Sequence, residues 1–509
     1  MDRRQALGLI AAGALHLGAA PKAAPPYDRQ PSGDLGNGFY RNPIIMAGDI
    51  ADISAIRVGH DYYLIHYHTC SPGFPIWHSR DLVNWQPVKR LMPRRGGEGE
   101  LCQYGEHFYH FFGVNRKLMV RRAPHPLGPW GDAVTLGVDS FDVAHIATPD
   151  GRRYIVSGSD GANLFELSRD GFKVISGPQR IYDGWPIPKD WDIECPCEEG
   201  WNIIYRNGYY YLTGAQGGTS GPPTAHMVVA ARARSMHGPW EHSPYNPILR
   251  TQSRDEPFWA QGHAKLIDTP DGKWYMFYHA YLKGHWNLGR VINLAPIEWT
   301  ADGWFRVPEG FRPDQPIPKP SGEAVPHGFR LVDDFTGPEL DVKWGFEGES
   351  AEGRYRFGPG GLLLKALGSN IANTAPMVMP VTHTAYEFEV EMTVPPGAEG
   401  GITVFFSHTA QASVALKDGE ILEYGRQMPF LPRTPYEGNH VFLKLEFKDD
   451  LVRRYYSRDG KSWTRLRITS EVSGFHRNAL GPAAGLRPGI FACGEGEVTV
   501  RRFRLRGLA

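Results

Sequence analysis

The sequence is short of net charge and of long hydrophobic runs, and each shortage excludes a class of protein. Lysine plus arginine and aspartate plus glutamate number 55 each, so no overall field would attract nucleic acid or an acidic membrane surface. Beyond the N-terminus, no uninterrupted apolar stretch reaches the length of a membrane span. We therefore expect no nucleic-acid partner and no membrane span, and a neutral substrate, small or polymeric.

Cysteine is also scarce. The five cysteines are an odd number without metal-ligand spacing, and Cys195 and Cys197 are one residue too close for a CxxC pair. We expect them to be small, buried apolar side chains, with one disulfide in an oxidising compartment as the alternative. They are Cys70, Cys102, Cys195, Cys197 and Cys493.

The N-terminus has the features of an export signal. Arg3 and Arg4 precede a short, weakly apolar run that ends among alanines and is too short for a membrane anchor. The arginine pair favours the twin-arginine route, with an ordinary Sec signal as the alternative. We expect residues 1–30 to be this signal and the protein to be periplasmic or secreted.

Glycine, proline and aromatic residues are abundant, and they recur in order. Five times a glycine-containing turn leads into an aromatic strand, at the anchors Tyr62, Phe108, Tyr154, Tyr210 and Tyr275. A second phrase, a turn followed by an aromatic residue, recurs in step with the first. A repeat of about 40 to 50 residues with insertions is typical of four-stranded propeller blades. The alternative, a β-sandwich with shared turn chemistry, has no reason to repeat both phrases in order.

A proline-dense stretch ends the repeats and divides the chain. Residues 308–325 are too rich in proline for a sheet interior and predict a semi-rigid linker. Residues 38–307 would then form a five-bladed β-propeller. Residues 326–509 alternate apolar and polar side chains without a helical period, which predicts a β-sandwich. The predicted fold class is all-β.

Carboxylates stand at matched offsets, about ten residues before the aromatic anchors. In a propeller the innermost strands line the central channel, so residues at their starts would converge on one end of the axis. Blade 2 is ambiguous between Glu98 and Glu100. The other four positions hold Asp52, Asp142, Glu199 and, in blade 5, His263.

Converging acids fit a particular chemistry. Mutual repulsion and partial burial separate the pKa values of neighbouring carboxyls. Glycoside hydrolysis needs that separation, because one carboxyl must donate a proton to the leaving oxygen while another is ionised to activate water or attack. A solvent-exposed turn residue remains the alternative for any single one of these acids.

The motifs around these residues resemble glycoside hydrolase family 43. The resemblance rests on Gly59-His60-Asp61-Tyr62-Tyr63-Leu64, Ser79-Arg80-Asp81-Leu82-Val83-Asn84-Trp85, Phe141-Asp142, Glu199-Gly200, Gly262-His263 and Gly289-Arg290. It implies a five-bladed propeller with Asp52 as general base, Asp142 as modulator of the acid's pKa, and Glu199 as general acid. Glu198 is the alternative acid.

The resemblance also implies partners for the acids. Arg290 would contact sugar hydroxyls, and His263 would lie near a bound ion. No cofactor would be required, although a structural Ca²⁺ reached through water near His263 is expected. The second domain resembles the concanavalin-like sandwich of the xylosidase-type branch, which can lend a loop to the pocket rim.

Four residues depart from the family pattern: Ile53, Val143, Trp201 and Asn202 stand where the family has Pro, Pro, Pro and His. We expect them to line the subsite of the non-reducing sugar and to alter sugar preference. Trp77, Trp201 and Trp286 are candidates for stacking on that sugar, with blade core as the equal alternative.

The resulting hypothesis is an inverting, exo-acting glycosidase of plant-type oligosaccharides or polysaccharides, similar to β-xylosidases and α-L-arabinofuranosidases. Inversion needs the base and acid carboxyls about 6.5 to 9.5 Å apart, whereas about 5 Å would indicate retention. The alternatives are a catalytically silent sugar-binding propeller and a same-clan hydrolase acting on galactan or fructan.

Overall fold

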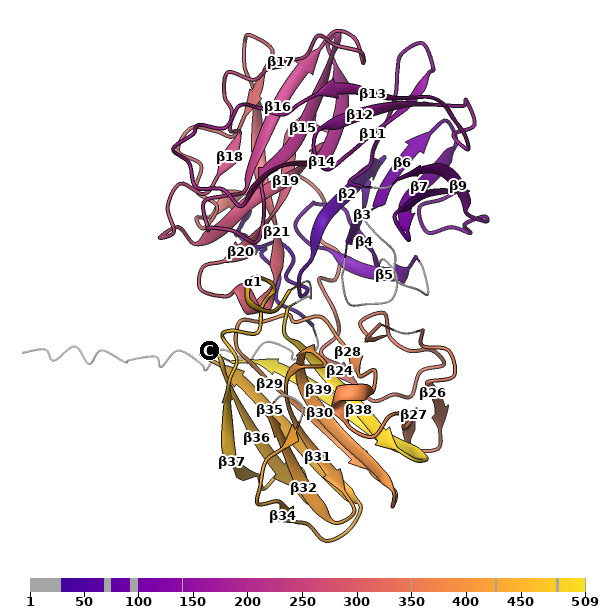
Figure 1. Cartoon of the computed structure of the whole chain (residues 1–509), viewed down its shortest axis with the longest axis vertical. Coiled ribbons are helices and arrows are strands. Elements are labelled where there is room, and N and C mark those ends of the chain that lie inside the picture. Colours follow the sequence, from indigo (N-terminus) through magenta and orange to yellow (C-terminus); the bar gives the residue numbers. More distant parts are fainter. Residues whose placement is uncertain are drawn as a thin grey trace, which may run out of the picture.

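The computed structural model describes residues 29–67, 75–91, 99–139, 141–348, 350–425, 428–481 and 485–508. Within them the chain is almost entirely β-structure and forms two bodies, the upper one indigo to salmon and the lower one orange to yellow in Figure 1. Most of the predicted signal, Cys70 and Glu98 lie outside the described residues. No helix of the described part is long and apolar enough for a membrane span.

The upper body consists of five antiparallel sheets, one for each predicted blade. Blade 1 has β2 (Ala51–Val58), β3 (Asp61–Tyr67), β4 (Pro75–Ser79) and β5 (Gln86–Arg90). Blade 2 has β6 (Gly99–Tyr104), β7 (His107–Val114), β8 (Lys117–Ala123) and β9 (Val134–Asp139). Blade 3 has β10 (Ala144–Ala147), β11 (Arg153–Ser157), β12 (Ala162–Leu167) and β13 (Val174–Tyr182).

Blades 4 and 5 are longer and complete the ring. Blade 4 has β14 (Cys195–Arg206), β15 (Tyr209–Gly217), β16 (Met227–Ala233), β17 (Glu241–His242) and β18 (Leu249–Arg250). Blade 5 has β19 (Phe258–Asp268), β20 (Trp274–Leu282), β21 (Arg290–Trp299) and β22 (Phe305–Arg306), with the 3-10 turn η1 (Trp286–Leu288) between β20 and β21. The first strands of successive blades contact one another, and β19 contacts β2, so the ring is closed. The prediction of a five-bladed all-β propeller is confirmed.

The repeated glycine phrase closes the first hairpin of a blade. In blade 4, Arg206 pairs with Tyr209 across Asn207 (φ 50°) and Gly208 (φ 81°). Positive φ at both central residues defines the tight turn that matches strand twist, and Asn-Gly is its preferred sequence. The aromatic anchor Tyr210 then packs into a cluster between blades 3 and 4.

The ring is fastened where its two ends meet. Nε and Nη2 of Arg57 in β2 donate to the two carboxylate oxygens of Asp268 in β19, at 3.0 and 2.6 Å. The N-terminal segment adds Asn42, whose amide exchanges hydrogen bonds with the backbone of Leu294 in β21. The proline-rich segment lies against the propeller as well, because β23 (Ile317–Pro318) pairs with β1 (Phe39–Tyr40).

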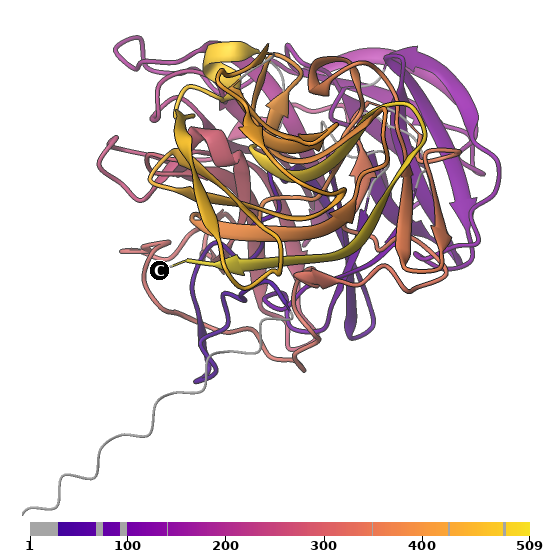
Figure 2. The ribbon, with the colours of Figure 1, turned by 90° about the horizontal axis from the view of Figure 1, so that it is seen from below.

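The lower body is a sandwich of two sheets (Figure 2). One sheet has the order β26 (Tyr355–Gly358), β27 (Gly361–Lys365), β39 (Glu497–Gly507), β29 (Tyr386–Thr393), β35 (His440–Lys448), β36 (Leu451–Ser457) and β37 (Thr464–Glu471), with β24 (Val332–Asp333) beside β39. The other has the order β25 (Gly345–Phe346), β28 (Met377–Val378), β38 (Arg487–Gly494), β30 (Ala398–Ser407), β31 (Ala410–Lys417), β32 (Glu420–Gly425) and β33 (Met428–Pro429), with β34 (Thr434–Pro435) beside β32. A 3-10 turn, η2 (Ile371–Asn373), precedes β28.

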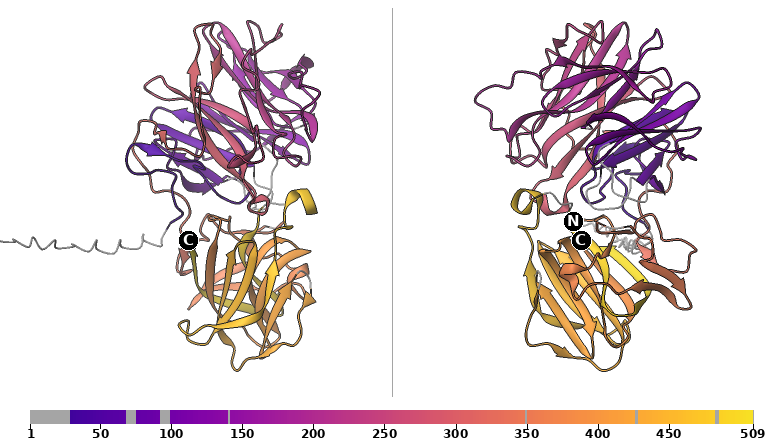
Figure 3. Two further views of the ribbon diagram at one scale, coloured as in Figure 1. Left: turned by 90° about the vertical axis from the view of Figure 1, so that its left-hand side faces the viewer. Right: turned by 45° about the vertical axis from the view of Figure 1, so that its right-hand side comes forward.

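The two bodies share one hydrophobic core. The sandwich cluster around Trp344 and Phe503 continues into Phe258, Leu288 and Val291 of the propeller. The short helix α1 (Arg477–Leu480) lies at this junction, against η1 (Figure 3). The propeller and the sandwich are therefore packed together rather than joined only by the linker.

The expectation that all cysteines are buried free thiols is partly wrong, and its alternative, one disulfide, is confirmed. Cys195 and Cys197 form a disulfide at the start of β14 and are half-buried, so they are not buried free thiols. The spacing is too short for a CxxC pair, and Cys197 adopts a left-handed backbone (φ 44°). Cys102 and Cys493 are free and buried as expected.

Candidate active site

The three predicted acids come from three blades, and His263 links them. Asp52 lies in β2, Asp142 two residues before β10, and Glu199 in β14. Nδ1 of His263, from β19, lies 3.2 Å from Oδ1 of Asp52 and 4.0 Å from Oδ2 of Asp142. The backbone N–H of Gly200 donates to Oδ2 of Asp142 at 2.8 Å, which places Glu199 beside Asp142.

Irregular backbone points these side chains toward the axis. Asp52, Asp142 and His263 have φ values of 49°, 44° and 57°, in the left-handed region that non-glycine residues rarely adopt. The pairing register shifts at Asp52, at Glu199 and at His263. A β-bulge re-aims a side chain that regular alternation would send elsewhere, and such strain concentrates at functional sites.

Glycine is required next to the acid. A Cβ at Gly200 (φ 67°) would lie 3.0 Å from ring atoms of His263 and 3.0 Å from the side chain of Ala215. The Glu199-Gly200 pair therefore lets the histidine approach the acids closely. This gives a structural reason for one of the motifs that carried the resemblance.

The environment of Glu199 keeps it protonated near neutral pH. Burial is the largest influence, and the neighbouring carboxylates of Asp142 and Asp52 add to it, so the pKa of Glu199 rises from 4.5 to about 8. His263 and Arg290 oppose this rise without cancelling it. A buried, neutral carboxylic acid of this kind can donate a proton at pH 7.

Asp52 is held through one of its oxygens. Three nitrogens surround Oδ1: Nδ1 of His263 at 3.2 Å, Nη1 of Arg290 at 3.3 Å and Nδ1 of His279 at 3.5 Å. Every hydrogen bond or ion pair of Asp52 within the described part of the chain uses Oδ1.

Arg290 is almost fully buried and is fixed by a second aspartate. Its Nε and backbone N–H donate to Oδ1 of Asp49 at 2.9 and 3.1 Å, and Nη2 donates to Oδ2 at 3.2 Å. Burial alone would raise the pKa of Asp49, but the charge and hydrogen bonds of Arg290 lower it to about 2. The guanidinium predicted to hold sugar hydroxyls therefore contacts carboxylates, and its contact with substrate remains a prediction.

Sequence reasoning missed Asp49 and two histidines. His226 and His279 are fully buried, with their rings stacked at 5.2 Å and an interplanar angle of 5°. Burial holds both pKa values well below 6.5, so both imidazoles are neutral. The signal for His279 was a polar residue inside the otherwise apolar strand β20, whereas nothing in the sequence singled out Asp49.

Two of the three predicted stacking aromatics are wrong. Trp77 is completely buried between blades 1 and 5, and Trp201 is buried between blades 3 and 4, where its indole N–H donates to the carbonyl of Gly158 at 2.8 Å. Trp286 is half-buried on η1 and packs against Trp259 and Tyr281. It stays a candidate because η1 immediately precedes Arg290.

The residues that depart from the family pattern are buried too, so the expectation that they line a sugar subsite is wrong. Ile53, Val143 and Trp201 belong to hydrophobic clusters between blades, and the side-chain oxygen of Asn202 accepts from the backbone N–H of Leu266 at 2.9 Å. Their neighbours in the blades determine these substitutions. They are no evidence for an altered sugar preference.

The ambiguous position in blade 2 has a structural explanation. Glu100 is buried, receives the ammonium of Lys265 at 2.8 and 2.9 Å and accepts the hydroxyl of Ser54 at 2.6 Å. It is therefore neutralised within the channel. Glu198, the alternative acid, accepts from the amide of Gln216 at 3.4 Å.

The residues near His263 do not fit a directly ligated Ca²⁺. One group of possible metal ligands among the described residues consists of Asp52, His263 and His279, whose ligand atoms lie within 4.8 Å of one another. This set offers one oxygen atom and two nitrogen atoms. Ca²⁺ takes six to eight oxygen ligands.

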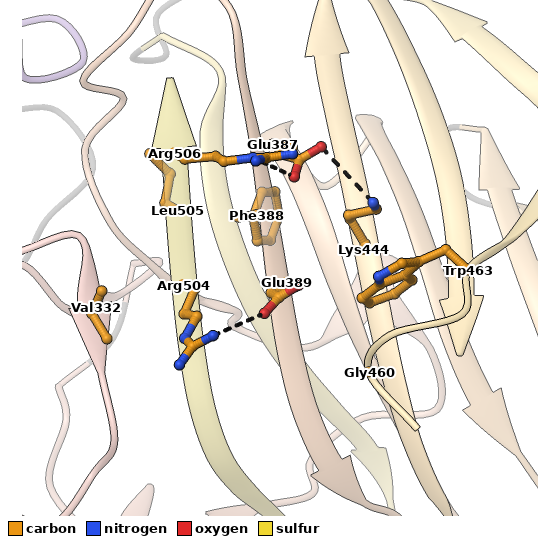
Figure 4. Close-up of a pocket in the computed structure, with 10 residues that line it drawn as sticks. All are labelled: Val332, Glu387, Phe388, Glu389, Lys444, Gly460, Trp463, Arg504, Leu505 and Arg506. Carbon is orange, nitrogen blue, oxygen red and sulfur yellow. Dashed lines mark hydrogen bonds and ion pairs between the residues drawn. The ribbon is translucent and has the colours of Figure 1, made fainter. Parts of the chain in front are cut away.

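A second hollow lies on the sandwich, far along the chain from these acids. This groove of about 710 Å³ crosses β24, β39, β29 and β35 and includes Trp463 (Figure 4). Its charges are largely paired, since Glu387 contacts Arg506 at 2.6 Å and Lys444 at 3.9 Å. It has none of the converging acids of the propeller site.

Two family descriptions match the chain. Glycosyl hydrolases family 43 matches residues 40–305, and the β-xylosidase C-terminal concanavalin A-like domain matches residues 332–502. The second match confirms the predicted kind of sandwich.

Individual proteins are similar as well. A non-reducing end α-L-arabinofuranosidase from Bacteroides ovatus is 31% identical over 294 residues, which are 53% of this chain and 53% of that protein. This chain therefore spans about half the length of that relative. A xylan 1,3-β-xylosidase from a Vibrio species is 24% identical over 84% of this chain and 90% of its own. The crystal structure of the GH43 protein BlXynB from Bacillus licheniformis is 25% identical, with a TM-score of 0.82 over 92% of this chain and 100% of that one.

Proposed function

Because the chain belongs to glycosyl hydrolases family 43 and is therefore a glycosidase, we propose that it removes xylose or arabinose from the non-reducing ends of oligosaccharides with inversion. The names of its relatives, a non-reducing end α-L-arabinofuranosidase and a xylan 1,3-β-xylosidase, favour these two sugars. Plant-type polysaccharide fragments would be the substrates.

The proposal rests on the different surroundings of two carboxyl groups, those of Glu199 and Asp52. Glu199 has a pKa raised to about 8 and keeps its proton at pH 7. Asp52 is surrounded at Oδ1 by nitrogen atoms, including the guanidinium of Arg290 at 3.3 Å. An acid and a base facing one cup are what hydrolysis of a glycosidic bond needs.

The reaction then proceeds in one displacement. Oδ2 of Asp52 takes a proton from a water molecule as the water oxygen attacks the anomeric carbon. Glu199 gives its proton to the departing glycosidic oxygen on the other face of the sugar. The anomeric configuration inverts, and solvent returns Asp52 to the carboxylate and Glu199 to the acid. Asp142 does not exchange protons but keeps Glu199 neutral between cycles.

Exo action is supported by the sandwich at one side of the site. Helix α1 packs against η1, and the backbone N–H of Leu486 donates to the carbonyl of Asn287 at 2.6 Å. The ring of His476 lies 6.5 Å from that of Trp286. A wall at this position would limit the site to a chain end, with Trp286 available to the sugar.

The substrate is tested with p-nitrophenyl pentosides and hexosides, using Glu199→Ala and Asp52→Ala as controls. We expect turnover of a β-xyloside or an α-L-arabinofuranoside by the wild-type protein, and almost none by either variant. Proton NMR of the first product should show the anomer opposite to that of the substrate. A wild-type protein that binds oligosaccharides but hydrolyses none would make it a silent sugar-binding propeller, and release of galactose or fructose would identify the other clan activity.

Two further expectations belong to the proposal. We propose that turnover requires no metal, so EDTA should leave kcat unchanged. We also propose export through residues 1–30, with a periplasmic or secreted location. Cell fractionation should find the protein outside the cytoplasm, and replacing Arg3 and Arg4 by lysine should retain it inside if the twin-arginine route is used.

A further inference from the structure

The groove of about 710 Å³ on the sandwich lies on the solvent-facing side of one sheet. Residues of β29 alternate between buried and half-buried, and the half-buried acids of this strand line the groove. A groove of this volume is in the range of ligand sites. Its polar and aromatic lining consists of two acids, three bases and one indole, namely Glu387, Glu389, Lys444, Arg504, Arg506 and Trp463 (Figure 4).

The ammonium of Lys444 has hydrogen-bonding capacity that the described part of the protein does not use. The Lys444 side chain is only 14% exposed, and its Nζ lies 3.9 Å from Oε2 of Glu387, too far for a hydrogen bond. Its other neighbours are the rings of Trp463 and Tyr455, whose centroids lie 4.5 and 4.8 Å away. A largely buried ammonium has three donors to satisfy, so this arrangement favours a ligand with acceptors between the rings and the carboxylate.

A turn that occurs twice in the chain places Trp463 in the groove. Residues 457–463 share serine, arginine, aspartate and tryptophan, at the same spacing, with residues 79–85. In both turns Oδ1 of the aspartate accepts the backbone N–H groups two and three residues later, at 2.7 to 3.0 Å. Trp85 is completely buried and its indole N–H donates to a backbone carbonyl, whereas Trp463 is half-buried and lines the groove. The same turn therefore gives one indole to the core and presents the other to a ligand.

The lining distinguishes between classes of ligand. Glu387 and Glu389 would repel a phosphate or another polyanion, and an apolar segment would bury the charges without partners. A hydroxyl group both donates and accepts, so it suits a row of mixed acids and bases. Nη1 of Arg504 and Oε1 of Glu389 are 3.9 Å apart, the same separation as in the pair of Lys444 and Glu387. A hydroxyl oxygen about 2.8 Å from both atoms would bridge either pair.

We infer that this groove binds a chain of a neutral, hydroxyl-rich polysaccharide and holds the enzyme on its polymeric substrate. Trp463 stacks on a sugar ring, while Lys444 and Arg504 bind hydroxyl groups together with Glu387 and Glu389. The choice of a xylan-type polymer rests on the proposed function. Chain ends would then be concentrated near the catalytic cup, which lowers KM for a polymer but not for a short glycoside.

Retention on a polymer is the first test. Full-length Glu199→Gln, which should bind without hydrolysing, is run in native gels that contain soluble arabinoxylan. Adding Trp463→Ala should weaken retention at least about tenfold, as the loss of an aromatic anchor does. The matched control is Tyr205→Ala, which removes an aromatic side chain 44% exposed on the propeller and should be retained as the parent is. Salt should change retention little, because stacking and hydroxyl contacts are not screened as ion pairs are.

Rate assays use the same substitutions with Glu199 intact. Trp463→Ala should raise KM for arabinoxylan about tenfold and leave kcat/KM for a p-nitrophenyl glycoside unchanged. Lys444→Gln should act in the same direction, and it provides the test if thermal unfolding shows that Trp463→Ala does not fold.

The inference is overturned if the parent protein is not retained, if salt abolishes its retention, or if both groove variants are retained as the parent is. It is also overturned if the variants alter only the sedimentation of the protein, which would make the groove a contact between copies of this chain. Hydrolysis with retention independent of Trp463 would refute this inference alone. Retention by a protein inert toward every glycoside would refute the proposed function alone.

Discussion

Replacing Asp142 by asparagine should move the alkaline limit of activity to lower pH. Asparagine keeps an oxygen that can accept the N–H of Gly200, which Oδ2 of Asp142 now accepts at 2.8 Å, so the local backbone is preserved. What the substitution removes is a negative charge beside Glu199. That charge is the second-largest influence on the pKa of Glu199, after burial.

The size of the effect follows from the raised pKa. A shift from 4.5 to about 8 corresponds to about 5 kcal/mol of preference for the neutral acid. Burial remains in the variant, whereas a like charge at this range contributes about one pH unit or more. We therefore expect the alkaline limb of kcat/KM, near pH 8 in the wild-type protein, to fall by about one pH unit in Asp142→Asn.

The direction of the pKa shift of Glu199 can also be checked through folding stability. Since the folded-state pKa of Glu199 is raised, its ionisation costs folding stability progressively as pH rises from 4.5 to about 8. Asp142→Asn should reduce that dependence in urea unfolding measured across this range.

The assay is a pH profile of kcat/KM with the best p-nitrophenyl glycoside. The control is Asp160→Asn, an exposed aspartate of the same blade, which should leave the profile unchanged. An alkaline limb that stays near pH 8 in Asp142→Asn, in a variant that is folded and active, would refute the modulator role of Asp142.

Three other substitutions test separate parts of the argument. Glu199→Gln should lower kcat by about 10²–10⁴ for an oligosaccharide and much less for a 2,4-dinitrophenyl glycoside, whose leaving group needs no proton; equal losses would mean that Glu199 is not the acid. Asp49→Asn should destabilise the protein by about 3–5 kcal/mol in urea at pH 7, because Arg290 loses its buried counter-charge; the wild-type pair should persist on acidification until pH approaches 2, the pKa of Asp49. Trp77→Ala should lower the free energy of unfolding by about 3–5 kcal/mol with KM unchanged. A raised KM with unchanged stability would instead show that the Trp77 indole contacts the substrate.

The blades and the acids could be predicted because they depend on local sequence. Turn residues such as Asn207 and Gly208 determine where hairpins close, and the strand order repeated in each blade places Asp52 and Glu199 on first strands, which line the axis. Those constraints repeat along the chain, so they are visible in one sequence.

The direction of individual side chains could not be predicted. A bulge of one residue exchanges the two faces of a strand, and the pairing register shifts at Asp52 and at His263. For the same reason the sequence did not distinguish between sugar stacking and core packing for Trp77 and Trp201. Asp49 became visible only when β21 brought Arg290 beside it.

The core shared by the two bodies limits how this enzyme can be rearranged. Phe258, Leu288 and Val291 of the propeller are buried in the same cluster as Trp344 and Phe503 of the sandwich. Separating the two domains within the linker would expose this apolar interface on both of them. Each separated domain would then be prone to aggregate. Neither domain is therefore well suited to fusion with an unrelated protein. A chimera would also need the residues with which the other domain covers this apolar surface.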